Sequence, residues 1–123
     1  MNGKGFELVR VTVDEKKKRV VCDPERARCF WRKGPDNVCW VFPQAPERVT
    51  SVVIEWKSDG PFRGFSARRS SVGSHLDDLL TAGNRQTKGV FPYAVRCLDA
   101  AGNVVAEVDP DVENQADPPP DEP

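Results

Sequence analysis

The stretch Val49-Thr50-Ser51-Val52-Val53-Ile54-Glu55-Trp56 decides the fold class of this chain. Val52, Ile54 and Trp56 recur at every second position, and Glu55 stands between two of them. In a β-strand successive side chains point to opposite faces, so a period of two is typical of a strand with one buried face. The stretch therefore predicts a strand that turns Val52, Ile54 and Trp56 toward a core.

Similar segments follow one another along most of the chain, and turn-forming residues separate them. Asp14–Lys18, Gly34–Asn37 and Asp99–Asn103 are rich in Gly, Pro, Asp, Asn and Lys, which favour turns between strands. We therefore predict an all-β fold, an antiparallel Greek-key β-sandwich of about seven short strands. The further strands are expected at 6–13, 19–22, 29–31, 38–42, 90–98 and 104–108.

One short helix is expected between the strands. Ser74 followed by Asp77 resembles a helix-capping pair, and His75–Leu80 is long enough for one or two turns before Gly83 and Asn84 end them.

The charges divide the 123-residue chain into a basic body and an acidic end. Residues 1–106 hold all 18 Lys and Arg, whereas residues 107–123 hold seven acids and no base. The end is also rich in proline and has almost no apolar side chains, so it offers little surface to bury. We predict a single β-sandwich domain over residues 1–112 and a disordered, acidic, proline-rich tail over residues 113–123. Transient contact of this tail with a basic face that includes Arg63, Arg68 and Arg69 is one interpretation, and a solubilising tail that ignores the body is the favoured one.

The last third of the chain resembles the final hairpin of cupredoxin-like domains. The resemblance is carried by Gly89-Val90-Phe91-Pro92-Tyr93-Ala94-Val95, then Asp99, Gly102 and Asp109-Pro110. It implies a β-sandwich that includes most of residues 6–112.

The same resemblance implies a domain without copper. In copper-bearing members the corresponding strand ends in a Cys ligand, and that position falls on Val95 here. A blue-copper site also needs two imidazoles, usually with a weak axial Met, whereas His75 is the one histidine and Met1 the one methionine. We therefore expect no cofactor and no electron transfer.

The sequence gives no sign of an enzyme. His75 has no partner that the pattern would bring to it, and an exposed histidine in a short helix explains it equally well. The glycines around Gly60 lack the Gly-Lys-Ser/Thr ending of a phosphate-binding loop.

The four cysteines lack the paired spacing of a zinc knuckle. All four fall in predicted strands, where a cysteine is usually a small buried side chain. Buried reduced thiols are the favoured interpretation, while a disulfide, first of all Cys22–Cys29, and a metal site stay open. The four are Cys22, Cys29, Cys39 and Cys97.

The loop between Phe62 and Ser71 is the strongest candidate for binding. It mixes arginines with two phenylalanines, so that it could contact phosphates while a ring stacks on a base. The alternative is that Phe62 anchors the loop to the core and the arginines form a solvated rim. The candidate binding residues are Phe62, Arg63, Phe65, Arg68, Arg69, Arg85 and Lys88.

These features predict a non-enzymatic β-sandwich that binds a protein partner through loops or an edge strand. Two alternatives are a binder of nucleic acid or anionic ligands through loop 62–71, and a metal or redox protein based on the cysteines. The isoelectric point near 5.8 speaks against nucleic acid. No segment predicts membrane insertion. The N-terminal residues lack a secretory pattern, so a cytoplasmic location is expected unless a leader has been removed.

Overall fold

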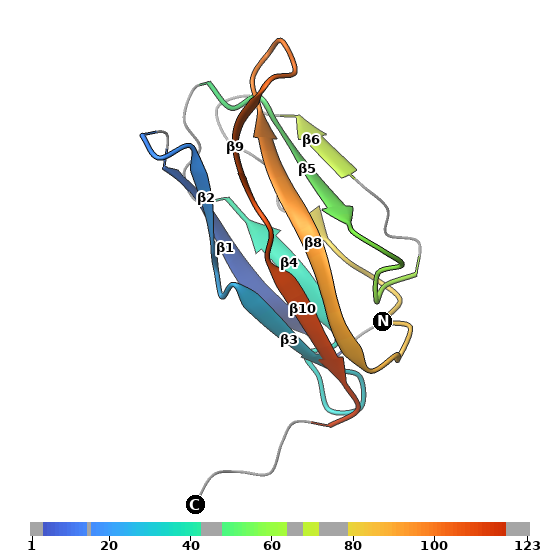
Figure 1. Cartoon of the computed structure of the whole chain (residues 1–123). Coiled ribbons are helices and arrows are strands. Elements are labelled where there is room, and N and C mark those ends of the chain that lie inside the picture. The colour runs from blue at the N-terminus through green and yellow to red at the C-terminus, as the bar shows by residue number, and fades with distance from the viewer. Residues whose placement is uncertain (1–3, 15, 43–47, 64–67, 72–78, 118–123) are drawn as a thin grey trace, which may run out of the picture.

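The computed structural model describes residues 4–14, 16–42, 48–63, 68–71 and 79–117, with the backbone alone over 68–71. The prediction of an all-β fold is confirmed, and Figure 1 shows the strands as one strongly curved sheet. The described residues form more strands than the sequence suggested. They are β1 (Phe6–Asp14), β2 (Arg19–Asp23), β3 (Arg26–Phe30), β4 (Asn37–Val41), β5 (Ser51–Trp56), β6 (Arg68–Ser71), β7 (Leu79–Leu80), β8 (Gly89–Leu98), β9 (Val104–Val108) and β10 (Asp111–Gln115).

The sheet is mixed, so the prediction of a purely antiparallel arrangement is wrong. The strand order is β3-β10-β8-β9-β2-β1-β4-β7, while β5 pairs with the other edge of β8 and β6 pairs with β5. Three of these pairs are parallel, namely β1 with β4, β2 with β9 and β3 with β10. Side-chain alternation shows where a strand lies but not which strand lies beside it, and parallel neighbours are joined by long connections.

Two Asp-Pro steps bend the sheet at the same level. Asp23-Pro24 separates β2 from β3, and Asp109-Pro110 separates β9 from β10. Proline has no N–H for a ladder, so it interrupts strand pairing. The two bends are joined where the Asp111 N–H donates to the Glu25 carbonyl at 3.2 Å. Beyond the bend, β10 replaces β9 as the neighbour of β8 and β3 replaces β2 as the outer parallel strand.

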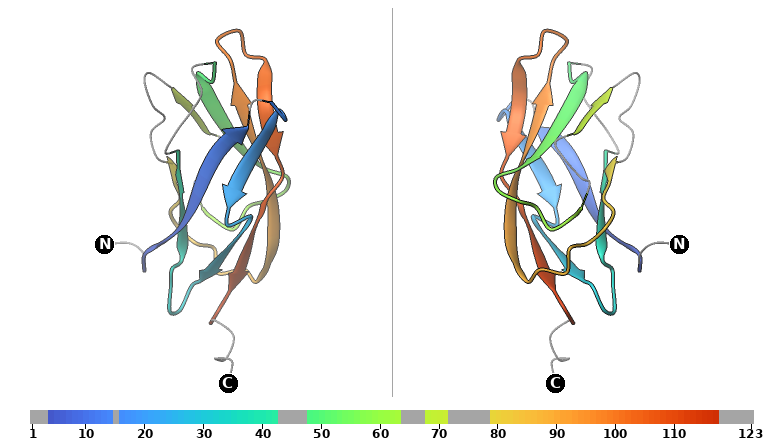
Figure 2. Two further views of the ribbon diagram at one scale, coloured as in Figure 1. Left: turned by 90° about the vertical axis from the view of Figure 1, so that its left-hand side faces the viewer. Right: turned by 90° about the vertical axis from the view of Figure 1, so that its right-hand side faces the viewer.

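The curvature brings β4 over β5 and β8, and large aromatic rings fill the space between them. Trp40 of β4 lies edge-on to Tyr93 of β8 with ring centroids 5.5 Å apart, and Trp56 of β5 lies 5.2 Å from Tyr93. The Trp40 indole N–H donates to the Tyr93 hydroxyl oxygen at 2.9 Å. These contacts hold two facing parts of the sheet together, and Figure 2 shows the ribbon of those parts from the side.

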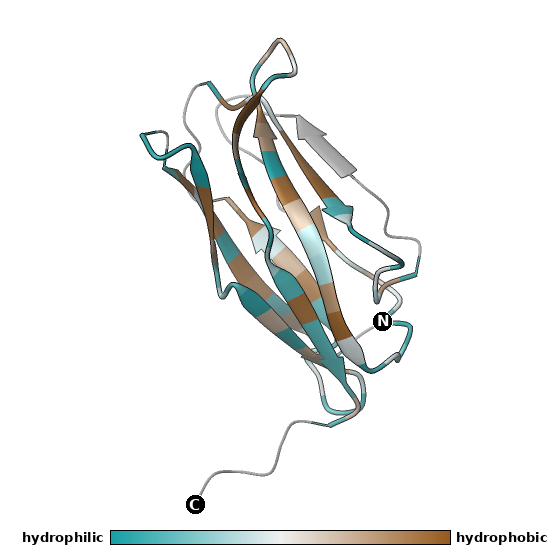
Figure 3. Ribbon diagram, in the orientation of Figure 1, coloured by the Kyte–Doolittle hydropathy of each residue, from teal (hydrophilic) through white to brown (hydrophobic). Residues whose placement is uncertain are grey.

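The core follows the predicted alternation. Val52 and Ile54 are fully buried, as are Val9 and Val11 of β1. Figure 3 shows bands of hydrophobic and hydrophilic colour alternating along the strands. The inward faces were thus identified from the sequence.

The predicted short helix is not seen in the described residues. Residues 72–78 lie outside them, and Leu79 and Leu80 form strand β7 instead. Leu79 pairs with Trp40 and is buried, whereas Leu80 pairs with Cys39 on the other face. Pairing with β4 therefore overrides the weak helical preference of two leucines, as tertiary context commonly does.

The predicted boundary of the disordered tail at residue 113 is also wrong. Strand β10 continues to Gln115, between β3 and β8, and Val112 and Asn114 are fully buried within it. Residues 118–123 lie outside the described part of the chain. Acidic composition concealed this strand because its charged side chains point outward and a single valine and an asparagine point inward.

We expect Ile54→Ala to lower the free energy of unfolding by about 2–5 kcal/mol, because Ile54 is fully buried and the truncation leaves a cavity. Its neighbour Glu55 is exposed and pairs with Arg96 at 3.0 Å, so Glu55→Ala should cost about 1 kcal/mol or less. Urea unfolding of both variants measures the difference. Equal losses would contradict the assignment of the inward face.

Candidate functional site

The predicted binding residues separate into a buried anchor and exposed bases. Phe62 is 1% exposed, and its ring centroid lies 5.9 Å from that of Trp56, so it anchors the loop to the core. The backbones of Arg68 and Arg69 belong to β6, opposite Ile54 and Val53 of β5. Phe65 lies outside the described residues.

A short antiparallel bridge brings Arg63 and Arg85 to the same surface. Phe62 pairs with Asn84, the Arg63 N–H donates to the Gly83 carbonyl at 2.6 Å, and the Arg85 N–H donates to the Pro61 carbonyl at 2.7 Å. Because side chains alternate along paired segments, Arg63 and Arg85 point away from the side that Phe62 and Asn84 occupy. Both arginines are exposed, as is Lys88 a few residues further on.

Two side-chain amides hold this bridge against the C-terminal strand. Asn84 and Asn114 donate to each other's amide oxygens at 2.9 Å in both directions. Asn84 also donates to the Asp36 carbonyl at 2.8 Å, and Asn114 donates to the Thr87 carbonyl at 2.9 Å. Asn114 is fully buried, so its hydrogen bonds are made without competition from water. These hydrogen bonds therefore fix the bridge between Phe62 and Asn84, and with it the backbone of Arg63 and Arg85.

The acids of the C-terminal part contact bases other than those of the predicted loop. Arg26 and Arg28 of β3 stand in register with Asp111 and Glu113 of β10, so the ion pairs follow the strand pairing. The pairs of residues 107–117 are Arg96–Glu107 at 3.7 Å, Lys57–Asp109 at 3.2 Å, Arg26–Asp111 at 2.8 Å, Arg28–Glu113 at 3.3 Å and Arg32–Asp117 at 3.8 Å. Within the predicted acidic tail, Glu113 thus belongs to strand β10, and Glu113 and Asp117 pair with Arg28 and Arg32. Neither of these acids forms an ion pair with Arg63.

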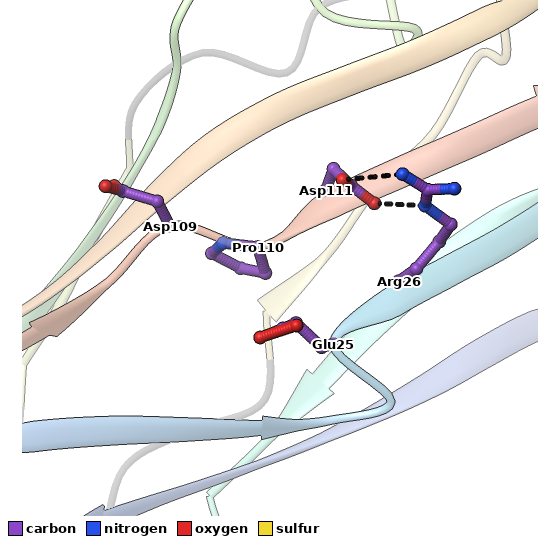
Figure 4. A pocket seen from close by; sticks show the side chains of 5 residues that line it. All are labelled: Glu25, Arg26, Asp109, Pro110 and Asp111. Atoms are coloured by element: carbon purple, nitrogen blue, oxygen red, sulfur yellow. Dashed lines mark hydrogen bonds and ion pairs between the residues drawn. The ribbon is translucent and has the colours of Figure 1, made fainter.

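A shallow hollow of about 380 Å³ lies where the two Asp-Pro bends meet (Figure 4). Arg26 and Asp111 lie side by side in it and are joined by two hydrogen bonds of 2.8 and 3.2 Å. The Asp111 carboxylate raises the pKa of the Arg26 guanidinium, first through these hydrogen bonds. Within the described residues, no group of three or more His, Cys, Asp or Glu side chains is placed to hold a metal ion. The hollow therefore lies at a junction of strands, and the charges of Arg26 and Asp111 in it already neutralise each other.

The four cysteines are buried thiols, spread over β2, β3, β4 and β8. Burial raises the pKa of Cys22 and of Cys29 to about 12, and that of Cys97 to about 11. The thiolate is the form that attacks disulfides and binds metals, so these environments oppose both reactions. The thiols serve the core as small apolar side chains.

We expect alkaline pH to destabilise the fold through these thiols. An exposed thiol has a pKa of about 8.5, below the folded-state values, so the unfolded chain releases its protons first. The contribution to stability is therefore complete below that pH and is lost as the pH rises toward the folded-state pKa values. The free energy of unfolding in urea should fall by about 1 kcal/mol or more between pH 7.5 and 9.5. An unchanged value would contradict the burial of these groups.

An apolar surface that the sequence analysis missed lies on the outer side of β1, β4 and β7. Leu8 pairs with Cys39 and Cys39 pairs with Leu80, so the three side chains form one row across the strands. Leu8 is 58% exposed, Leu80 45% and the neighbouring Phe6 43%, while Cys39 is buried between the leucines. We call Phe6, Leu8, Cys39 and Leu80 the apolar face. Its signal in the sequence was the pair Phe6 and Leu8, which share the outward face with Arg10.

No family model, no curated protein and no solved structure matches this chain. Val95, where the resemblance noted in the sequence would place a copper-ligating Cys, is fully buried and pairs with Ile54. His75 lies outside the described residues. Among the described residues, no helix has the length and apolar character needed to cross a lipid bilayer.

Proposed function

We propose that this protein is a non-enzymatic binding module that docks a protein partner on the apolar face. The observation that carries the proposal is the exposure of Phe6 and Leu8 on β1 and of Leu80 on β7, in one row across β4. Exposed apolar side chains are common singly, but a contiguous group with a polar rim is typical of an interaction site. Arg10 continues the same side of β1 and supplies part of such a rim.

The size of the apolar face favours a transient partner over a permanent dimer. Three half-exposed side chains present a few hundred Å² at most, whereas a standard interface buries about 800 Å² on each partner. A small apolar centre surrounded by polar contacts is the usual arrangement of a binding hot spot. The partner therefore contributes a complementary apolar side chain to a larger polar contact.

The test compares two charged substitutions at equally exposed apolar positions. Leu8→Glu places a charge in the apolar face, and Val104→Glu places one at Val104 of β9, which is 51% exposed. A partner captured from a lysate with the wild-type protein is identified, purified and titrated by calorimetry. We expect Leu8→Glu to weaken its binding by at least about tenfold and Val104→Glu by less than about twofold.

Two results would overturn this proposal. One is an equal effect of Leu8→Glu and Val104→Glu on the purified partner. The other is a wild-type dimer in sedimentation that Leu8→Glu dissociates, because the face would then join two copies of the chain. Melting temperatures of both variants are measured first to show that each is folded.

At the level of fold, we propose a Greek-key sandwich related to the copper-free cupredoxin-like domains. The facing positions of Trp40 and Tyr93 and the buried Val95 support this relationship. The parallel strand pairs distinguish it from an antiparallel sandwich.

A further inference from the structure

We propose that Arg63 and Arg85 form a second binding site, which takes one phosphate group carried by the side chain of an extended peptide. The site shares no residue with the apolar face and does not depend on it. The bridge between Phe62 and Asn84 places both arginines on one side of two paired segments. Cross-strand neighbours on one face lie within reach of each other when their side chains are long, as arginine is.

The two arginines are presented from a rigid base. Phe62 is packed in the aromatic core next to Trp56, and Asn84 is tied to the buried Asn114. Backbone hydrogen bonds of 2.6 and 2.7 Å fix Arg63 and Arg85 themselves. A site whose backbone is already ordered loses little conformational entropy when it binds. The cost of binding is therefore limited to the two arginine side chains.

The charges of the site are not neutralised by the described part of the protein. Arg63, Arg85 and Lys88 are exposed, and no described acid forms an ion pair with any of them. By contrast, the bases nearest the C-terminal strand are paired with its acids. Opposite Arg63 stands Gly83, where a Cβ would come within 3.1 Å of the Arg63 Cβ. An anion can therefore reach both arginines.

The chemistry of arginine favours phosphate as the anion. A planar guanidinium donates two parallel hydrogen bonds to phosphate oxygens, and pairs or clusters of arginine recognise phosphorylated side chains. Both arginines are exposed, so water competes for their hydrogen bonds and a free phosphate ion would be held weakly there. A peptide adds contacts on either side of its phosphate group.

Nucleic acid fits this surface less well. Its affinity for proteins comes from many phosphate contacts made at once. Arg26, Arg28 and Arg32 are occupied by acids and do not extend a basic track from the site. Two arginines can hold one phosphate group, but they cannot follow a strand of nucleic acid.

The test uses fluorescence anisotropy with a labelled peptide of glycine and serine that carries one phosphoserine, and with its unphosphorylated twin. We expect the phosphorylated peptide to bind the wild-type protein at least about tenfold more tightly than the twin. Arg63→Gln and Arg85→Gln should each weaken it by about five- to tenfold. The matched control is Arg19→Gln, an exposed base of β2 with the same change of charge, which should have less than about a twofold effect.

Three outcomes would overturn the inference. Equal binding of the two peptides would exclude phosphate recognition, and an equal effect of Arg19→Gln would reduce it to general electrostatics. Tighter binding of a single-stranded oligonucleotide that Arg63→Gln and Arg85→Gln abolish would assign the site to nucleic acid. Leu8→Glu should leave peptide binding unchanged. A negative result for the phosphorylated peptide can therefore be told apart from a negative result for the protein partner on the apolar face.

Discussion

A chain that ends at Val112 is expected to lose most of its stability, although composition alone predicts that residues 113–123 are dispensable. The truncation removes Asn114 with its amide network and the outer half of β10, which pairs with β3 on one side and β8 on the other. It leaves Asn84 without its amide partner and Arg28 without Glu113. We expect a loss of about 5 kcal/mol or more, which is comparable to the whole stability of a small domain.

The matched control is a chain that ends at Asp117. It keeps β10 and the Arg32–Asp117 pair, and it removes a proline-rich segment that has no apolar side chains to bury. The melting temperature should fall by more than about 15 °C for the shorter chain and by only a few degrees for the longer one. If the chain ending at Val112 melted close to the full-length protein, strand β10 would not belong to the folded core.

Asn114→Ala is expected to lower the free energy of unfolding by about 3 kcal/mol or more. The substitution removes a fully buried amide that exchanges two hydrogen bonds with Asn84 and donates a third to the Thr87 carbonyl. Each hydrogen bond contributes about 0.5–1.5 kcal/mol net, and this substitution removes three of them together. Urea unfolding measures the loss.

A double-mutant cycle isolates the contact between the two amides. Asn84→Ala alone should cost somewhat less than Asn114→Ala, since Asn84 is partly exposed. The double variant should be more stable than the sum of the two losses predicts, by about 1–2 kcal/mol, because each single variant already breaks the shared hydrogen bonds. Additive losses would show that the two amides do not act as one unit. The Gln115→Ala variant, one residue along β10 and on its half-exposed side, provides the control.

The candidate sites differ in how far the sequence could predict them. Phe62, Arg63 and Arg85 were identified from their residue types, but only the bridge between Phe62 and Asn84 showed which of them meet. The apolar face was missed because Leu80 is far from Phe6 and Leu8 in the sequence and joins them only through strand pairing across β4. A register position is set by the partner strand, so no single segment reveals it.

The sequence by itself determined the class of fold and the inward face of the strands, because alternation is a local property of a half-buried strand. Val52, Ile54, Val9 and Val11 are buried as their spacing indicates. Only the tertiary structure decided which strands pair in parallel and that the acidic segment Asp111–Gln115 forms a strand of the sheet. Asp111 and Glu113 are typical of a solvated tail until Arg26 and Arg28 stand opposite them, 85 residues away in the chain. Pairing at such a distance depends on how the whole sheet closes around its core, and no local pattern contains that information.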